Sequence, residues 1–262
     1  MTKETVEAHY AFRRAGGDRL NGLVHAVGGI VKGGLLLLTK RTWAGMHHIP
    51  LQGPVILVWN HYSDFDPLPV AHYVYNSGRH PRFLLKHSLL KIPVVGPIIK
   101  ATGQIPVHRG RSDAADSLRT AIEVLTAGGT VLIAPEGSVT KEPDRWPMRG
   151  KTGVARLALT TGAPVVPIAQ WGSLAVHDRH RSPKFKLGRR KPVTVVAGPP
   201  VDLSRWQGAE ITREHLTAVT DTIMEALREG VAELRGEQPP PLFDLREHRK
   251  PRREDEESEP TE

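Results

Sequence analysis

The segment "PVILVWNHYSDFDP" (residues 54–67) changes from apolar to polar at a single point. Residues 55–59 are apolar and rich in valine and isoleucine, which is typical of a short buried strand. His61 lies just after this run, and Asp66-Pro67 then supplies a helix start, because proline fits the first helical turn and aspartate caps it. The segment therefore predicts a strand, a turn and a helix, with a histidine near the carboxyl end of the strand.

Strand-like and helix-like runs alternate along the rest of the chain. Short apolar runs rich in valine and isoleucine occupy residues 82–85, 103–107, 130–134, 164–169 and 193–198. Apolar residues at helical spacing predict helices over 112–127, 151–161 and 211–235. The alternation predicts an α/β fold, a single domain with a mostly parallel central sheet flanked by helices. Two prolines in the 164–169 run indicate an edge strand or a bent strand there.

The N-terminal region has a different pattern. Residues 20–38 carry apolar side chains at helical spacing, whereas Asn21, His25 and Lys32 fall away from the apolar stripe, and basic residues flank the segment on both sides. An apolar face between basic flanks favours an amphipathic helix that lies on a membrane surface. Two alternatives remain open at this point, a helix packed against the domain and a helix that spans the membrane.

These patterns divide the chain into three parts. We expect residues 1–48 to form a helical membrane-associating region and residues 49–243 to form the α/β domain. Residues 244–262 contain eight acidic and five basic residues and few apolar ones, which predicts a disordered, charged tail.

The composition limits the classes of function. The chain has no cysteine, which excludes disulfide bonds, thiolate catalysis and thiolate metal sites. A hydrophobic fraction of 39% and a charged fraction of 24% are ordinary for a globular protein and exclude a polytopic membrane protein. The net charge of +8 suits an acidic partner, such as an anionic membrane surface, a phosphorylated small molecule or a nucleic acid.

His61 and Asp66 are the first candidates for chemistry, because polar groups at the carboxyl ends of parallel strands gather at one edge of a sheet. The two residues are five positions apart, so their side chains meet only if the backbone between them turns. In that arrangement the carboxylate fixes the imidazole tautomer and stabilises the imidazolium, which makes the histidine a general base. The alternative is that His61 is a polar strand end and Asp66 only caps a helix.

Two later loops supply further candidates. His108 and Arg109 follow one predicted strand, and a guanidinium group suits phosphate through its forked donors. Glu136 and Gly137 follow another strand, where a carboxylate and a bare backbone are able to bind a polar ligand. Taken singly, each loop is also compatible with an ordinary solvated turn.

Taken in order, the loops resemble a known family. Residues 60–66 read Asn-His-x-x-x-x-Asp, residues 103–109 read Gly-x-Ile-Pro-Val-x-Arg, residues 135–138 read Pro-Glu-Gly-Ser, and residues 165–168 read Val-Val-Pro-Ile. This set resembles the glycerolipid acyltransferases, specifically the 1-acyl-sn-glycerol-3-phosphate acyltransferases, over roughly residues 50–200. The resemblance implies an α/β domain preceded by an N-terminal helical membrane-binding motif.

The resemblance also implies roles for individual residues. By position, His61 matches the catalytic histidine and Asp66 its partner. Arg109 matches the phosphate-binding arginine, and Glu136 and Gly137 match the pair that binds the acceptor.

The third motif departs from the family pattern. Where relatives read Phe-Pro-Glu-Gly-Thr-Arg, residues 134–139 read Ala-Pro-Glu-Gly-Ser-Val. Ser138 keeps the hydroxyl group, but Val139 replaces the arginine. Arg149 and Lys151 are candidates to supply the missing charge, and Lys151 resembles the basic residue that precedes the next helix in relatives.

The implied reaction moves a fatty acyl group from an acyl thioester, acyl-CoA or acyl-ACP, to the hydroxyl of 1-acyl-sn-glycerol 3-phosphate. The product is phosphatidic acid, a step of phospholipid biosynthesis. A positioned histidine base contributes about 10²–10⁴-fold to such a reaction. The chain lacks both cysteine and a Gly-x-Ser-x-Gly elbow, which favours direct transfer without an acyl-enzyme. We expect a peripheral or monotopic protein on the cytoplasmic face of the membrane, with a basic cluster at residues 179–191 facing lipid headgroups, coenzyme A or solvent.

Three alternatives stand beside this hypothesis. The same chemistry on a glycolipid, glycerol 3-phosphate or a lysophospholipid differs only in the acceptor. A basic nucleic-acid-binding protein is disfavoured, since no helix-turn-helix or zinc-finger pattern is evident and aromatic residues are only 5% of the chain. A metal hydrolase built on the thirteen histidines is disfavoured because their spacing lacks a carboxylate-supported ligand set. We therefore expect no cofactor, no metal site and no nucleic-acid partner.

Overall fold

A five-stranded sheet lies at the centre of the protein. The computed structural model describes residues 20, 22–107, 113–178, 182, 184–245 and 247, and for residues 113–117 it describes the backbone alone. The sheet contains β1 (Thr39–Ala44), β2 (Val55–Trp59), β5 (Thr130–Ile133), β6 (Val165–Trp171) and β7 (Lys191–Ala197), in the order β1-β7-β6-β2-β5. Its pairings are parallel except that between β6 and β7. The prediction of an α/β fold with a mostly parallel sheet is confirmed.

A smaller sheet joins the edge of the first. It pairs β3 (Leu84–Lys86) with β4 (Ile105–Val107), and a parallel bridge links Phe83 to Leu132 of β5. The short helices η2 (His87–Lys91) and α4 (Val95–Ala101) connect its two strands. Because this bridge and the pairing of β3 with β4 are both parallel, β4 ends toward the same edge as β5.

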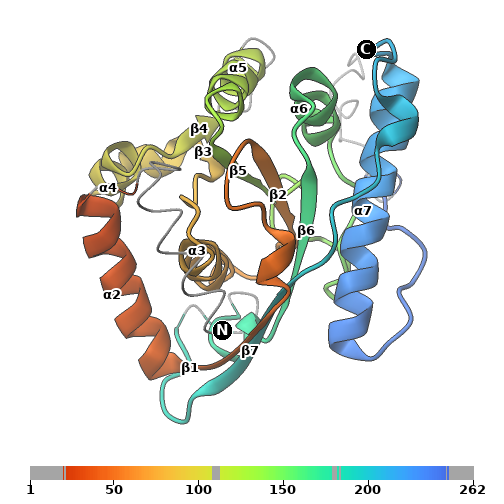
Figure 1. Ribbon diagram of the computed structural model, residues 1–262. Helices are drawn as coiled ribbons and strands as arrows, with labels where there is room; N and C mark the ends of the chain where they lie inside the picture. The colour runs from red at the N-terminus through yellow and green to blue at the C-terminus, as the bar shows by residue number, and fades with distance from the viewer. Residues whose placement is uncertain are drawn as a thin grey trace, which may run out of the picture.

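Helices cover both faces of the central sheet (Figure 1). On one face α3 (Pro67–Asn76) packs against the strands, and α2 (Gly22–Leu38) packs against α3. The other face carries α5 (Asp113–Thr126), α6 (Gly153–Thr161) and α7 (Arg213–Arg235). Short 3-10 turns occur at η1 (Met46–His48), η3 (Ser173–Ala175) and η4 (Ser204–Trp206).

The strand β2 shows why the opening apolar run has no alternation. Ile56 and Val58 pack with the α5–α7 side, whereas Val55, Leu57 and Trp59 pack with the α3 side. All five residues are buried, since helices cover both faces. A continuous apolar run is the expected pattern for such a strand, and it ends where the sheet edge meets the loops.

The strand β1 departs from the predicted organisation. The sequence pattern predicts a helical region over residues 1–48, but residues 39–44 pair in parallel with β7 and belong to the sheet. The burial of β1 alternates, with Thr39, Arg41 and Trp43 turned inward. Two of these three side chains are polar, so the period-two pattern is masked in the sequence. The α/β domain therefore begins before residue 49.

The prediction of an edge strand is wrong for β6, while the alternative of a bent strand stays a prediction. The strand lies between β7 and β2 rather than at an edge, although it contains Pro167. The backbone oxygen of Pro167 accepts a hydrogen bond from Gly198 N, just beyond the end of β7, and ladder pairing with β7 begins at Ile168. The missing N–H of Pro167 thus faces the point where its neighbour ends, so a central strand tolerates this proline.

The helix α2 matches the predicted helix over 20–38. Val24 and Leu35 are buried, and His25 Nδ1 lies 2.6 Å from Tyr75 Oη on α3. Leu23, Ile30 and Leu37 repeat every seven residues and are exposed by 41%, 76% and 76%. The helix therefore packs one apolar side on the domain and exposes another. None of the described helices combines the length and apolar character needed to cross a bilayer.

The C-terminal segment differs from the prediction at its start. Asp244, the first residue of the expected disordered tail, is buried and pairs with Arg149. The backbone oxygen of Phe243 also accepts a hydrogen bond from Arg149 N. The chain is thus fixed to the domain as far as residue 244, because a carboxylate there meets a guanidinium. Most of the expected tail, residues 248–262, lies outside the described residues.

Candidate active site

The carboxylate of Asp66 organises the turn after β2. Its Oδ2 atom accepts hydrogen bonds from Tyr62 N at 2.7 Å and Ser63 N at 2.6 Å, and lies 3.2 Å from His61 Nδ1. Asp66 is the N-cap residue of α3, yet its side chain makes no capping bond to the helix. The expected cap is therefore wrong in detail, since the side chain turns back onto the loop. That reversal closes the five-residue gap between His61 and Asp66.

The imidazole of His61 is held from several directions. A carboxylate only accepts, so Nδ1 carries the proton toward Asp66 and Nε2 keeps the free lone pair. The ring lies 4.8 Å from the ring of Trp59 between centroids. The side chain of His61 is 18% exposed, whereas that of Asp66 is fully buried. This arrangement leaves a basic nitrogen that a ligand can reach, backed by a buried charge.

The backbone of His61 is fixed by the loop after β5. His61 N donates to Glu136 Oε1 at 3.0 Å, and the oxygen of His61 accepts from Thr140 N at 2.7 Å. Glu136 Oε2 accepts in turn from Met148 N at 3.1 Å. Burial raises the pKa of the Glu136 carboxyl to about 8, although the donors from His61 and Met148 act in the opposite direction. The structure thus gives Glu136 a positioning contact, while its predicted role in binding the acceptor stays a prediction.

A paired amide at the end of β2 joins the site to β6. Gln170 N donates to Asn60 Oδ1 at 2.9 Å, Asn60 Nδ2 donates to the Gln170 oxygen at 3.1 Å, and Gln170 Nε2 donates to the Asn60 oxygen at 3.1 Å. Both side chains are buried, so these bonds extend the β2–β6 ladder past its last backbone pair. Sequence reasoning missed Gln170, because its partner is 110 residues away.

The turn that carries Tyr62 and Ser63 is fixed to the segment after β6. Ser173 N donates to Tyr62 Oη at 3.0 Å, and Ser63 Oγ donates to the His177 oxygen at 2.7 Å. The ring of Tyr62 stacks on Trp171 at 4.8 Å between centroids. Burial, and next the charge of Asp66, raise the pKa of Tyr62 well above its usual value, so the hydroxyl stays neutral. The loop that carries His61 is therefore rigidly supported on both sides.

The loop after β5 brings Lys151 to Gly137. Gly137 has φ 72°, and a Cβ atom added there would lie 2.7 Å from Lys151 Nζ. Lys151 N donates to the Pro135 oxygen at 2.8 Å, which ties the lysine to this loop. Ser138 is half-buried, and its Oγ donates to the Val139 oxygen at 3.2 Å. A glycine at 137 thus lets the lysine side chain lie across the loop that holds His61.

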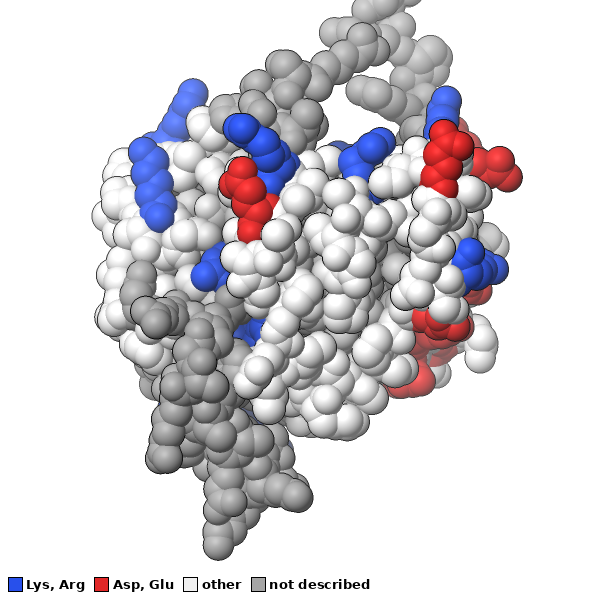
Figure 2. All heavy atoms as spheres, turned by 45° about the horizontal axis from the view of Figure 1, so that its top comes forward, with Lys and Arg blue, Asp and Glu red and all other residues white. Residues whose placement is uncertain are grey.

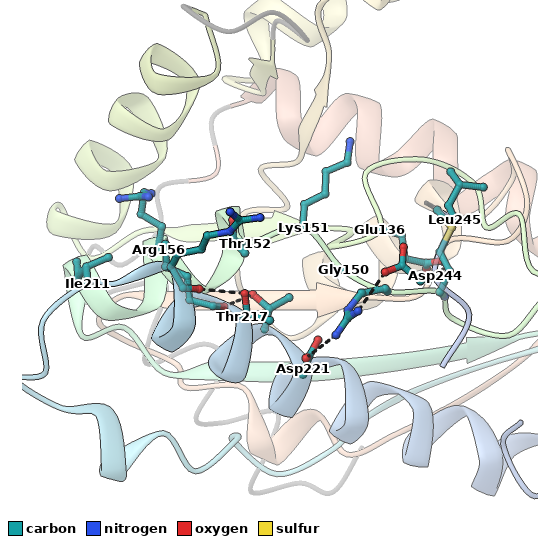
Figure 3. A pocket seen from close by; sticks show the side chains of 15 residues that line it. Glu136, Gly150, Lys151, Thr152, Arg156, Ile211, Thr217, Asp221, Asp244 and Leu245 are labelled. Carbon is teal, nitrogen blue, oxygen red and sulfur yellow. Dashed lines mark hydrogen bonds and ion pairs between the residues drawn. The ribbon is translucent and has the colours of Figure 1, made fainter. Parts of the chain in front are cut away.

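Arg149 has a different environment from Lys151. Its guanidinium bonds Asp221 at 3.1 Å and Asp244 at 3.0 Å, and these carboxylates raise the pKa of Arg149. The dashed lines at Asp221 and Asp244 in Figure 3 mark this link between α7 and the C-terminal segment. Two carboxylates balance this charge. Lys151, the other candidate to replace the arginine of the third motif, lies against Gly137 instead.

A cavity of about 550 Å³ opens beside these residues, between the start of α6, the start of α7 and the C-terminal segment. Figure 3 shows that Lys151 and Arg156 point away from the carboxylate of Asp221. Arg109 and His108 lie outside the described residues, so the structure does not place the predicted phosphate-binding arginine. Within the described part of the chain, no three His, Asp or Glu side chains gather as a metal site.

The charge of the protein is spread out on the face seen in Figure 2. Lys and Arg side chains stand apart from one another there, several beside Asp or Glu, around a centre of uncharged residues. The described residues of that face form no continuous basic stripe of the kind that follows a nucleic-acid backbone.

The fold and the site define a class of protein. A reachable imidazole backed by a buried carboxylate, at the carboxyl edge of a mostly parallel sheet, is an arrangement for activating a hydroxyl nucleophile. The family model described as Acyltransferase matches residues 40–171, half of the chain. The protein belongs to the acyltransferase family, which confirms the resemblance noted in its motifs.

Individual relatives agree with this assignment. The 1-acyl-sn-glycerol-3-phosphate acyltransferase of Borreliella burgdorferi is 34% identical over 131 residues, covering 49% of this chain and 50% of that protein. The chloroplastic 1-acyl-sn-glycerol-3-phosphate acyltransferase BAT2 of Brassica napus is 31% identical over 132 residues, covering 49% of this chain and 36% of that protein. The chain thus spans about half the length of the first relative and about a third of the second.

A solved structure shares most of the fold. The crystal structure of the 1-acyl-sn-glycerophosphate (LPA) acyltransferase from Thermotoga maritima superposes with a TM-score of 0.63 at 25% identity. The likeness covers 82% of this chain and 81% of that one.

Proposed function

We propose that this protein transfers a fatty acyl group from an acyl thioester to the free hydroxyl of 1-acyl-sn-glycerol 3-phosphate, giving phosphatidic acid. The observation that carries the proposal is the reachable imidazole of His61, 3.2 Å from the buried carboxylate of Asp66. Membership of the acyltransferase family supports acyl transfer. The relatives named as 1-acyl-sn-glycerol-3-phosphate acyltransferases support this acceptor.

In the proposed reaction His61 acts as general base and then as general acid. Nε2 removes the proton of the acceptor hydroxyl as its oxygen attacks the thioester carbonyl. The new oxygen–acyl bond forms, the carbon–sulfur bond breaks, and the imidazolium returns the proton to the departing thiolate. Asp66 stabilises the imidazolium between these steps, and its own charge is held by two backbone N–H groups.

The phosphate of the acceptor needs positive charge close to His61. We assign this role to Lys151 and Arg109, with Glu136 and Gly137 forming the floor of the acceptor site. The support for Lys151 is its side chain lying across Gly137, on the loop that bonds the backbone of His61. Arg149 is a weaker candidate because Asp221 and Asp244 balance its charge.

The donor and the membrane complete the proposal. Acyl-CoA and acyl-ACP present the same thioester, and both are compatible with the base. We propose that the protein is peripheral or monotopic on the cytoplasmic face, with α2 as its membrane-binding helix. The exposed line of Leu23, Ile30 and Leu37 supports this role for α2, because such a face suits the boundary between headgroups and acyl chains.

The test is thiol release from palmitoyl-CoA, oleoyl-CoA and acyl-ACP in the presence of a panel of acceptors. We expect release with 1-acyl-sn-glycerol 3-phosphate and a product whose mass is that of phosphatidic acid. Equal or faster release with a lysophospholipid that lacks the phosphomonoester would contradict the assigned acceptor.

The second candidate is the same chemistry on another lipid acceptor. Val139 favours this alternative, because it stands where relatives carry the arginine of the third motif. Glycerol 3-phosphate and a glycolipid acceptor therefore belong in the same panel.

A further inference from the structure

A second polar site lies where the C-terminal end of α2 meets β1. This junction is at the lower left of Figure 1. It is an open cleft of about 470 Å³. We call it the cationic cleft, and its charged residues are Lys32, Lys40, Arg41 and Arg190. Leu36, Thr39, Trp43 and Asn76 complete its lining. The lining thus contains four cations and no carboxylate.

The cations of the cationic cleft have no carboxylate partner in the part of the chain that the structure describes. Burial, and next the charge of Arg190, lower the pKa of Arg41, which shows that the cations repel each other. An anion in the cleft would relieve this repulsion, because a cleft lined by one sign of charge concentrates ions of the opposite sign.

Arg41 is fixed in place rather than loosely solvated. Its Nη1 atom lies 3.0 Å from His72 Nδ1, and its guanidinium lies 5.0 Å from the centroid of the Trp43 ring. A guanidinium only donates, so His72 Nδ1 accepts and the ring proton is on Nε2. His72 is 2% exposed, and its Nε2 has no hydrogen-bond partner in the described part of the chain. A buried histidine thus orients the guanidinium of Arg41. The remaining donors of this guanidinium are available to a ligand.

The cationic cleft is separate from the catalytic edge. Asp66 precedes the first residue of α3, whereas Asn76 is its last residue and lines the cleft. Ten helical residues at about 1.5 Å each place the two sites about 15 Å apart. In the sheet, β7, β6 and β2 follow β1 in that order, so the cleft is also at the far side from His61. An acceptor phosphate bound at His61 does not reach this cleft.

Exposed apolar residues lie next to the lining of the cationic cleft along the chain. Leu36 lines it, Leu37 is its neighbour on α2, and Arg190 reaches the backbone oxygen of Leu36 at 3.5 Å. Leu187, three residues before Arg190, is 74% exposed. A soluble phosphate ester has no hydrocarbon to contact these apolar side chains, whereas a phospholipid places hydrocarbon directly beside its phosphate.

We propose that the cationic cleft binds the phosphate of an anionic glycerophospholipid, with Leu37 and Leu187 entering the acyl region beside it. Arg41 is the oriented, forked donor, and Lys32 and Arg190 are the surrounding charges. The cleft is thus a headgroup site that fixes α2 and the domain on an anionic bilayer. It rests on the membrane association proposed above but not on the proposed reaction.

The test is flotation of the full chain with vesicles of phosphatidylcholine alone and of phosphatidylcholine with phosphatidylglycerol. We expect binding to the anionic vesicles to weaken about thirty-fold in K32Q/R190Q, which corresponds to about 1 kcal/mol for each cation near an anionic surface. The matched control is K141Q/R205Q, which removes the same charge from exposed positions outside the cleft and keeps the wild-type affinity. Circular dichroism and the thermal midpoint establish that each variant is folded.

Arg41→Lys separates a built site from diffuse charge, because it keeps the charge and loses the fork. We expect about five-fold weaker binding, the loss of roughly one hydrogen bond. Wild-type binding by Arg41→Lys, together with an equal loss in K141Q/R205Q, would overturn the proposal in favour of diffuse attraction.

Two further measurements identify the source of the phosphate and separate vesicle binding from the proposed reaction. If inorganic phosphate or glycerol 3-phosphate displaces the protein from anionic vesicles as well as a soluble short-chain phosphatidylglycerol does, the site is one for a soluble phosphate and the proposal is wrong. His61→Ala should bind the vesicles like wild type. A failure of the proposed acyl transfer therefore leaves the vesicle result intact, and a failure of vesicle binding leaves the reaction to be judged on thiol release.

Discussion

His61 precedes α3 and faces the carboxylate of Asp66, whereas His72 lies in the second half of α3 and faces the guanidinium of Arg41. The partner decides which ring nitrogen carries the proton. Asp66 accepts, so the proton of His61 is on Nδ1 and the lone pair is on the reachable Nε2. Arg41 donates, so the lone pair of His72 is already used and its proton is on a buried Nε2.

The environments reinforce this difference. Burial, and next the charges of Arg41 and Lys32, lower the pKa of His72 to about 4, so it stays neutral at physiological pH. His61 faces a carboxylate instead, with its Nδ1 atom 3.2 Å from Asp66 Oδ2. Two histidines on the same helix and turn thus serve opposite purposes, one as a candidate base and the other as a support for a cation.

Among the variants that test this comparison, His61→Ala is expected to have the largest effect on activity. Removal of the base should lower the rate of thiol release by about 10⁴-fold, the upper end of what a positioned base contributes. The fold should survive, because the bonds that fix residue 61 run through its backbone. Single-turnover thiol release and circular dichroism provide the check. A folded, active variant would rule out His61 as the base.

Asp66→Asn tests whether the negative charge of Asp66, and not only its shape, contributes to the activity of His61. The amide keeps an acceptor for the turn but cannot stabilise an imidazolium, so we expect kcat to fall about 10²-fold with little change in acceptor KM. The turn should loosen too, because a neutral amide oxygen holds these three donors less strongly than the charged Oδ2 does. The kcat and KM values for the same acceptor separate the two effects. An unchanged kcat would mean that Asp66 only shapes the loop.

Glu136→Gln should have a smaller effect, through the position of His61. A carboxamide has one oxygen for the two backbone donors of His61 and Met148, which leaves one buried N–H unpaired at a cost of about 1–3 kcal/mol. We expect kcat to fall about ten-fold, in line with a misplaced base. Denaturant unfolding and kcat measured on the same samples check both parts. Loss of stability with full kcat would show that Glu136 supports the fold alone.

The pH dependence of stability sharpens the role of Glu136. Its pKa rises from the usual 4.5 to about 8 on folding, so between these values the folded state holds a proton that the unfolded state has released. Stability therefore falls as pH rises through this window, by roughly 1 kcal/mol per pH unit, and the contribution is fully present below about 4.5. Unfolding at several pH values should show this slope in the wild type and not in Glu136→Gln. The same slope in both proteins would assign it to another group.

The two histidines also show what a single sequence can reveal. The apolar run of β2, the polar turn and the Asp66-Pro67 helix start are local signals, so the fold class and the approach of His61 to Asp66 could be predicted. The contacts that support them are distant in sequence: His61 with Glu136 over 75 residues, Asn60 with Gln170 over 110, and Arg41 with His72 over 31. Their pairing depends on strand order and register, which hydrophobic periodicity does not encode. For the same reason β1 was hidden by its inward polar residues, and the central position of Pro167 was missed.

Gly137→Ala is expected to have the smallest effect, and it tests the loop after β5, which bonds the backbone of His61. Gly137 has φ 72°, so alanine there costs about 1–2 kcal/mol, and its Cβ would also displace Lys151 Nζ. Gly162→Ala is the matched control, because Gly162 has φ 65° with no atom within 4 Å of the added Cβ. Both variants should lose similar stability, but only Gly137→Ala should raise the KM for the phosphorylated acceptor, by a few-fold. Equal KM values in the two variants would show that Lys151 does not bind the acceptor phosphate. Another residue would then have to supply the positive charge that the third motif lacks.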